Sequence, residues 1–144
     1  MSFSFIRVVQ ATTAATVLET LFAVIRSYSF NMIPVIFYLI IEFVFLFAII
    51  CIGGFVVGRI SQQTFWARRL LFFGIVVSPS IISYLFFYSG VSYYEQNGNT
   101  LVMNHHLTSA GIGSIFVNMF VSAIISTIAT AIYFRTNSPS KQDH

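Results

Sequence analysis

Residues 32–58 read MIPVIFYLIIEFVFLFAIICIGGFVVG, and this stretch decides the fold. It is the longest apolar run in the chain, and Glu42 is its only charged residue. A run of this length and composition crosses the hydrocarbon core of a bilayer as a helix. A carboxyl group inside such a helix is costly, so Glu42 is a candidate functional residue by default.

The composition of the 144-residue chain indicates a membrane protein throughout. Charged residues make up 8% of it and hydrophobic residues 57%. A soluble domain carries about 25% charged residues, so the lipid bilayer must be part of the surroundings of this chain. Cys51 is the single cysteine, which excludes an intramolecular disulfide. We interpret Cys51 as an apolar packing residue of its span.

Four apolar segments predict an all-α polytopic membrane protein, a four-transmembrane-helix up-down bundle in a single domain over residues 1–144. The spans are expected at about residues 6–25, 32–58, 70–91 and 110–134, with an outer loop at 92–109 and a cytoplasmic tail at 135–144. Each span reaches the ~20 residues that a crossing helix needs. In the outer loop, Asn97 and Gly98 form a type I′ turn signal and predict a small hairpin.

The first span is the weakest, because one of its faces is polar and consists of Gln10, Thr12, Thr13, Thr16, Glu19 and Thr20. This amphipathic pattern allows two interpretations. Either the segment spans the membrane with its polar face toward neighbouring helices, or three spans are joined by an N-terminal helix lying flat in the interface. We favour the span, because a flat helix usually carries several basic residues and none lies between Arg7 and Arg26.

Basic residues predict the orientation. The ends of the spans that share one side of the membrane carry Arg7, Arg59, Arg68, Arg69, Arg135 and Lys141, whereas loop 92–109 has no Lys or Arg. The positive-inside rule therefore places the N-terminus and the C-terminus in the cytoplasm. Arg26, in the short outer turn, is the exception. We expect a bacterial inner membrane, because the chain is compact and has no large soluble part.

The most polar groups of the four spans are expected at a common depth, about 9 to 17 Å below the outer surface. They are Glu42, Glu19, Asn118, Ser83 and Ser80. If the helices turn these groups inward, they form a polar pocket that holds a cation or relays protons. The alternative for Glu42 is a protonated carboxyl that only links helices by hydrogen bonds. The alternative for Glu19 is pairing with Arg26 or contact with lipid headgroups.

Pro79 lies near the middle of the third span. It removes the backbone hydrogen bond to the Ile75 carbonyl and predicts a kink. The flanking serine hydroxyls can satisfy the freed carbonyl. We interpret the kink as static packing, with a hinge for a moving helix as the alternative.

Small residues predict close helix packing. Gly54 and Gly58 form a G-x-x-x-G pair, and the fourth span has a ridge at four-residue spacing made of Ala110, Ser114, Asn118, Ser122, Ser126 and Thr130. Such patterns let another helix approach closely. They leave open whether that helix belongs to this chain, to a second copy or to a membrane-protein partner.

No pattern predicts catalysis, a metal site, a cofactor or nucleic-acid binding. His105 and His106 are neighbours that do not face the same way, so we interpret them as solvated loop residues. No serine or cysteine stands with a histidine in a recognisable catalytic arrangement, and no glycine loop for phosphate is present. We therefore expect that the protein is not an enzyme.

Three functions remain, in decreasing order of support. The first is an accessory or assembly subunit that acts through helix–helix contacts with a membrane-protein partner or as a homo-oligomer. The second is a small proton- or cation-coupled carrier that uses Glu42 together with Glu19 and Asn118. The third is a membrane-embedded enzyme, and its support is slight. For all three functions, architecture alone does not imply an activity.

Overall fold

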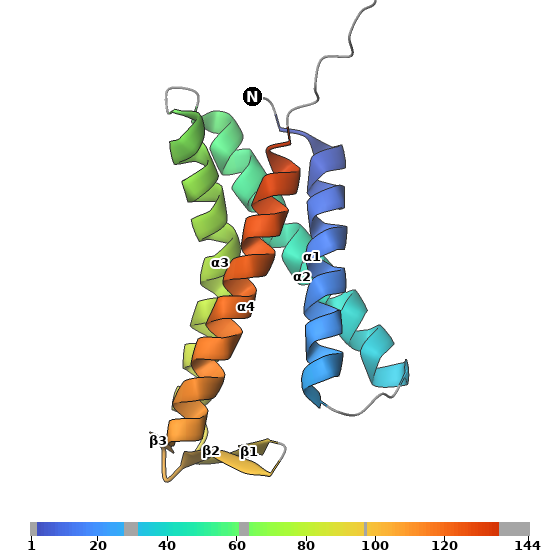
Figure 1. Ribbon diagram of the computed structural model, residues 1–144. Helices are drawn as coiled ribbons and strands as arrows, with labels where there is room; N and C mark the ends of the chain where they lie inside the picture. The colour runs from blue at the N-terminus through green and yellow to red at the C-terminus, as the bar shows by residue number, and fades with distance from the viewer. Residues whose placement is uncertain (1–2, 28–31, 61–63, 97, 136–144) are drawn as a thin grey trace, which may run out of the picture.

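The computed structural model describes residues 3–27, 32–60, 64–96 and 98–135 (Figure 1). Within these residues the chain forms four long helices, α1 (Phe5–Ser27), α2 (Met32–Arg59), α3 (Phe65–Gly90) and α4 (Ser109–Tyr133). A small sheet follows α3 and consists of β1 (Tyr93–Gln96), β2 (Asn99–Met103) and β3 (His106–Leu107). All four of these helices are long and apolar enough to cross a membrane. The structure thus confirms the predicted all-α four-helix membrane bundle.

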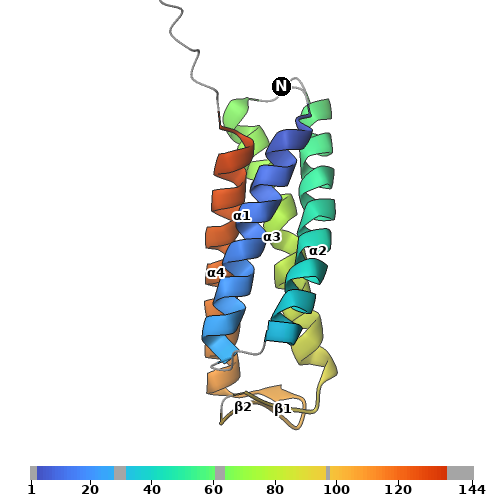
Figure 2. The ribbon, with the colours of Figure 1, turned by 90° about the vertical axis from the view of Figure 1, so that its right-hand side faces the viewer.

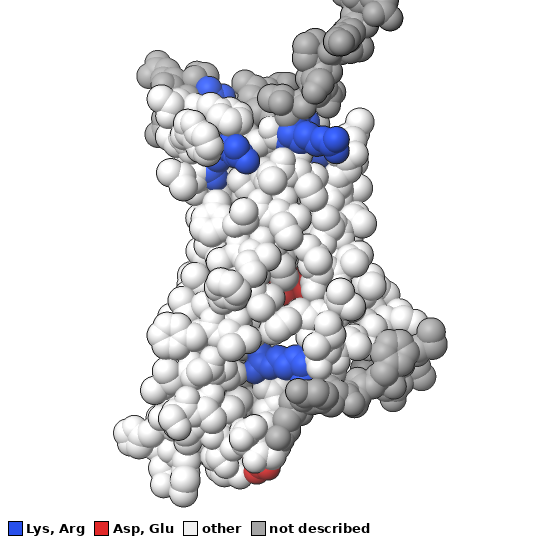
Figure 3. All heavy atoms as spheres, in the orientation of Figure 1, with Lys and Arg blue, Asp and Glu red and all other residues white. Residues whose placement is uncertain are grey.

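The bundle has two different ends. The sheet covers one of them, which we call the sheet end. We call the other the basic end, because the described arginines that flank the spans lie there: Arg7, Arg59, Arg68, Arg69 and Arg135. Figure 3 shows most of the basic atoms of this face gathered at this end, with a further basic group in the sheet-end half and acidic atoms in the middle of the face and at the sheet. Lys141 lies outside the described residues.

Helix α1 stands in the bundle as one of the crossing helices. It packs along α2 and α4, and Figure 2 shows it running beside both of them. Part of its polar face is buried, as Thr12, Thr16 and Glu19 show, whereas Gln10 and Thr13 are exposed. This arrangement favours the span over the flat interfacial helix.

The starts of α3 and α4 follow from threonine caps. Helix α3 begins at Phe65 rather than at Leu70, because the Thr64 hydroxyl accepts a hydrogen bond from the Ala67 amide at 3.3 Å. Helix α4 begins behind Thr108, whose hydroxyl accepts from the Gly111 amide at 3.1 Å. Such caps satisfy backbone N–H groups that the first helical turn leaves without partners.

The basic-end half of the bundle is a closely packed aromatic and aliphatic core. Phe72 of α3 stacks on Tyr133 of α4 with ring centroids 4.5 Å apart, and Phe134 meets Phe72 edge-on at 5.6 Å. Gly54 of α2 makes this possible, because a Cβ atom there would lie 2.7 Å from the Tyr133 hydroxyl oxygen. Fully buried apolar side chains around this core include Val8, Ala11, Ala15, Ile50 and Ala129.

The predicted packing motifs are used inside this chain. Ser122 and Ser126 of the α4 ridge are each 3% exposed. Gly54 lies against Tyr133, and a Cβ atom at Gly58 would lie 3.6 Å from the backbone nitrogen of Phe3. These motif residues thus pack against other parts of the same chain.

Helix α3 continues through Pro79 without interruption. The Ile75 carbonyl, which loses its usual backbone donor at Pro79, accepts a hydrogen bond from the Ser78 hydroxyl at 3.3 Å. The expected serine compensation is therefore present.

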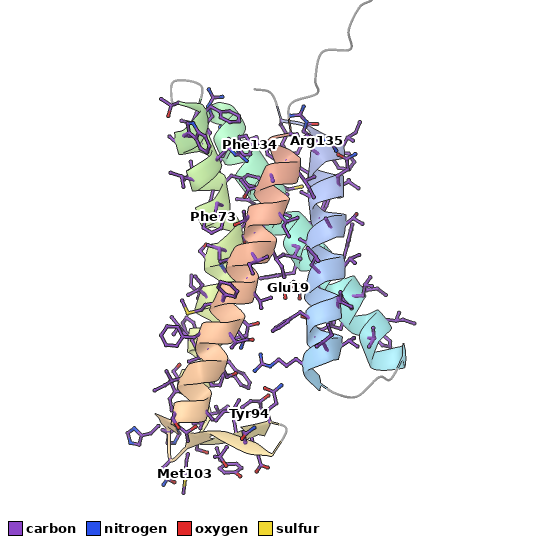
Figure 4. All side chains as sticks on the ribbon, viewed as in Figure 1. Glu19, Phe73, Tyr94, Met103, Phe134 and Arg135 are labelled. Atoms are coloured by element: carbon purple, nitrogen blue, oxygen red, sulfur yellow. The ribbon has the colours of Figure 1, made fainter. Side chains whose placement is uncertain are left out.

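The small sheet confirms the predicted hairpin and adds a third strand to it. Strands β1 and β2 are antiparallel with Gln96 opposite Asn99, which leaves a two-residue turn that includes Gly98 at φ +75°. Strand β3 was not expected. It pairs with β2 through a second tight turn, in which Asn104 and His105 both have positive φ. Figure 4 shows Tyr94 between the sheet and the helices and Met103 pointing away from them.

Candidate functional site

Arg26 reaches from the sheet end of α1 to α4 and to the sheet. Its guanidinium donates to Oδ1 of Asn118, to Oγ of Ser114 at 2.5 Å and to Oε1 of Gln96 at 2.8 Å. These three acceptors are neutral oxygens. The Ser114 hydroxyl also shares a hydrogen bond with the Tyr88 hydroxyl of α3 at 3.2 Å. We call Arg26, Ser114, Asn118 and Gln96 the arginine cluster; it ties α1, α4 and β1 together.

Two carboxyl groups come from the neighbouring helices α1 and α2. Glu19 of α1 is 9% exposed, and Figure 4 shows it pointing from α1 into the interior beside α4. Glu42 of α2 is half-buried and lies within electrostatic range of Glu19. Tyr38 of α2 and Tyr84 of α3 interact electrostatically with both carboxyls. We call Glu19, Glu42, Tyr38 and Tyr84 the acidic cluster.

Three cavities in the described part of the chain meet at Arg26 and Gln96. The first, of about 340 Å³, lies between α1, α4 and the sheet. The second, of about 350 Å³, lies between α3, α4 and the sheet, and Tyr84, Tyr88 and Asn118 line it. The third, of about 200 Å³, lies between α1, α2 and α3, and both Glu19 and Arg26 line it. The sheet-end half is therefore hollow, and its cavities are lined by polar groups from all four helices.

The structure brings together some of the candidate site residues and separates others. Asn118 and Ser83 line the second cavity, and Glu19 lines the third. The Ser83 hydroxyl donates to the Ser80 carbonyl of its own helix at 2.8 Å. Ser80 lines none of the three described cavities, and neither does Glu42, which lies at the side of Glu19. Glu19 and Arg26 both line the third cavity, and the expected pairing between them stays a prediction.

Four residues of these clusters are missing from the sequence-based site: Arg26, Tyr38, Tyr84 and Gln96. Arg26 carried a signal, because it is the exception to the charge bias between the two sides of the membrane. The two tyrosines resemble ordinary apolar residues of a span, although each has a polar tip that needs a partner when buried. Gln96 gave no signal, because its role depends on how the loop folds back over the helices.

This arrangement holds acidic and basic groups in one hollow region inside the span-forming helices. Ionisable side chains within membrane spans are rare, face the bundle interior and mark ion or substrate pathways. The described residues contain no group of three or more His, Cys, Asp or Glu side chains that could hold a metal ion. His105 and His106 are both exposed at the sheet end.

Comparison with protein-family models, with curated proteins and with solved structures finds no significant match to this chain.

Proposed function

We propose that the protein is a small integral-membrane carrier that couples the movement of a polar solute to protons through Glu19 and Glu42. The observation that carries this proposal is the meeting of three cavities at Arg26, with Glu19 lining one of them. The packing motifs that favoured an accessory subunit are occupied within the chain, so they no longer favour that role over transport. The proposal includes no catalytic activity.

The contrast between the two halves supports alternating access. The cavities extend to residues of the sheet, such as Gln96 and Asn99, whereas the stack of Phe72 on Tyr133 fills the basic-end half. A carrier that has its solute site open on one side and a packed barrier on the other occupies one of its two states. Pro79, between the two halves, is the natural hinge for the other state.

We further propose that the basic end faces the cytoplasm of a bacterial cell, across its inner membrane. The support is the charge bias, because Arg7, Arg59, Arg68, Arg69 and Arg135 lie at one end. A test begins with Cys51→Ala, which removes the native cysteine. Ser92→Cys and Ser4→Cys are then introduced separately. A membrane-impermeant maleimide added to intact cells is expected to label Ser92→Cys and to spare Ser4→Cys, and the reverse pattern contradicts this orientation.

Proton movement tests the carrier proposal. The purified protein is reconstituted in liposomes that contain a pH-sensitive dye, and a potassium gradient with valinomycin imposes a negative interior. A mixture of small polar solutes is added outside, because a coupled carrier moves protons only together with its solute. The protein is then expected to acidify the interior, and Glu19→Gln or Glu42→Gln is expected to reduce the rate to that of empty liposomes. Glu95→Gln is the matched control, because Glu95 is exposed in β1 and is expected to leave the rate unchanged. Equal rates for all four proteins contradict the proposal.

An accessory subunit is the second candidate, and one observation favours it. Residues 36–41 of α2 are all exposed, and six consecutive helical residues cover every face of a helix. This segment offers a contact surface to a partner helix. Gentle-detergent purification tests it: a protein that travels with the wild type and is lost in Ile40→Ser supports the accessory role. Retention of that protein by Ile40→Ser contradicts the role of this segment.

A further inference from the structure

Two apolar cores stabilise the described part of the bundle, and different helices contribute to them. The core of the basic-end half takes side chains from all four helices, and on α1 it ends at Leu18. The smaller core at the sheet end comes from α3, the sheet and α4, and its buried members are Tyr88, Leu101 and Val102. Among the described residues, no side chain of α1 or α2 belongs to this second core. Core packing between α1 and the unit of α3, sheet and α4 is thus concentrated in the basic-end half.

Beyond Leu18, helix α1 faces cavities. Phe22 and Ile25 line the first cavity together with Leu101 and Val117. Figure 1 shows α1 and α4 close together at the basic end and farther apart toward the sheet. Apolar side chains that line a cavity lose contacts on one side, so they stabilise an arrangement less than side chains in a packed core do. Packing alone therefore holds the sheet-end part of α1 weakly.

Arg26 links α1 to the other unit at this place. Its guanidinium donates to Asn118 and, at 2.5 Å, to Ser114, both of α4, and at 2.8 Å to Gln96 of β1. Hydrogen bonds from a charged donor are stronger than those between neutral groups. Their net contribution is nevertheless modest, because bonds to water can replace them. A polar link of this kind holds the end of a helix and can still be released when water enters.

We propose that these hydrogen bonds form a releasable link, the Arg26 latch, which controls access to Glu19. Arg26 lines all three cavities, and Glu19 lies in the third. Release of the latch lets the sheet-end part of α1 tilt away from α4 and the sheet, while the basic-end core stays packed. Arg26 lies about 27 Å along α1 from the buried Val8, so a tilt of about 10° moves it by about 5 Å, enough to break its hydrogen bonds. This inference rests on the proposed function in treating the cavities as a solute site, and it names the residue that regulates entry.

The reactivity of a cysteine in the third cavity tests the latch. In the Cys51→Ala background, Ala23→Cys introduces a thiol into the lining of this cavity with a small change in volume. The protein in lipid nanodiscs is treated with a charged, water-soluble methanethiosulfonate, and mass spectrometry measures the rate of modification. Arg26→Met keeps a long side chain but removes the hydrogen bonds. It is expected to raise the rate about tenfold or more, because the open state becomes more populated.

A second cysteine position and a second latch variant complete the test. Ala15 lies on the same helix but is 0% exposed in the basic-end core, so Ala15→Cys is expected to stay unreactive with or without Arg26→Met. Gln96→Ala removes one acceptor of the latch and is expected to raise the Ala23→Cys rate by a smaller factor. It changes no helix residue, so it tests the latch independently of how Arg26→Met folds. The effect of Arg26→Met is expected to be smaller in the Gln96→Ala background, because both variants break the same bond.

Two results overturn the inference. One is an Ala23→Cys rate that stays within about twofold of its original value in both Arg26→Met and Gln96→Ala. The other is an equal acceleration of Ala15→Cys, which shows that Arg26 supports the whole bundle rather than the sheet-end part of α1. The proton-flux assay separates this failure from failure of the carrier proposal. Glutamate-dependent flux with an unchanged Ala23→Cys rate leaves the carrier and removes the latch, whereas faster modification without such flux leaves a gated cavity and removes the carrier.

Discussion

In the basic-end half of the bundle, Phe72, Tyr133 and Phe134 contact one another through their rings, whereas in the sheet-end half Glu19 and Arg26 face cavities. Close packing stabilises the basic-end half, where Gly54 fits against the ring of Tyr133. The sheet-end half is held by hydrogen bonds between long side chains and a small sheet. Close packing stabilises a fold, and hollow polar regions are where binding and motion occur. We infer that stability and function are located in opposite halves.

The largest effect on stability is expected from Phe72→Ala in the basic-end half. Loss of this fully buried ring is expected to lower the free energy of unfolding by about 3–5 kcal/mol, because it leaves a cavity beside Tyr133 that the neighbouring side chains fill poorly. Unfolding by SDS in mixed micelles measures it. Phe86→Ala is the control on the same helix, since Phe86 is 74% exposed. Equal losses for both variants break the distinction between a packed half and its lipid-facing surface.

Gly111→Ala tests how the sheet is attached to the bundle. A Cβ atom at Gly111 would overlap the Leu101 carbonyl oxygen of β2, so backbone must move. We expect a loss of about 1–3 kcal/mol, together with faster hydrogen exchange of the β2 amides. A Cβ atom at Gly113 meets no atom within 4 Å, so Gly113→Ala is expected to be neutral or to stabilise α4 by up to about 1 kcal/mol. Identical behaviour of the two variants contradicts tight sheet docking.

Thr108→Val tests the junction between the sheet and α4. The Thr108 hydroxyl donates to the Thr100 carbonyl at 2.6 Å and caps α4 through the Gly111 amide. Its removal is expected to lower the free energy of unfolding by about 1 kcal/mol. Thr127→Val is the matched control, because the exposed Thr127 bonds only within α4, to the Ala123 carbonyl. A loss in the control as large as in the test variant shows that the junction contributes nothing special.

The smallest effect is expected at the boundary between the halves. Ser78→Ala removes the donor to the Ile75 carbonyl and is expected to cost about 0.6–1 kcal/mol. In a Pro79→Ala background the cost is expected to shrink, because the restored backbone N–H at position 79 can donate to Ile75 itself. A double-mutant cycle by SDS unfolding measures this coupling, and strict additivity shows that Ser78 does not compensate for the proline.

The sequence predicts the two halves unequally well. The helices follow from apolar runs bounded by polar residues, and the hairpin follows from Asn97 and Gly98, because both depend on local chemistry. Glu19 and Asn118 could be singled out because polar groups in spans are costly. The full set of residues that line the cavities at this depth could not be predicted from the sequence. Glu42 and Ser80 fall outside the cavities because helix rotation is set by packing between helices, which depth alone does not determine.

Long side chains account for the rest of the difference. The position of Arg26 in the sequence predicts a place at the membrane surface, yet its flexible side chain carries the guanidinium to α4 and β1. Gln96 lies in β1, and the docking of this strand onto the helices depends on contacts between residues far apart in sequence. Strand β3 has two residues, too few for any alternating pattern to show.

The stack of Phe72 on Tyr133 has an electrical consequence. In the proposed carrier, water entering the cavities would bring the potential of the sheet-end solution toward Glu19, and the transmembrane voltage would then fall mainly across the packed core of the basic-end half, which includes Val8, Ala15 and Phe72. A charge that crosses the whole voltage gains about 2.3 kcal/mol for each 100 mV. The same core that stabilises the fold would thus be the electrical barrier that a proton leaving Glu19 for the opposite side has to cross.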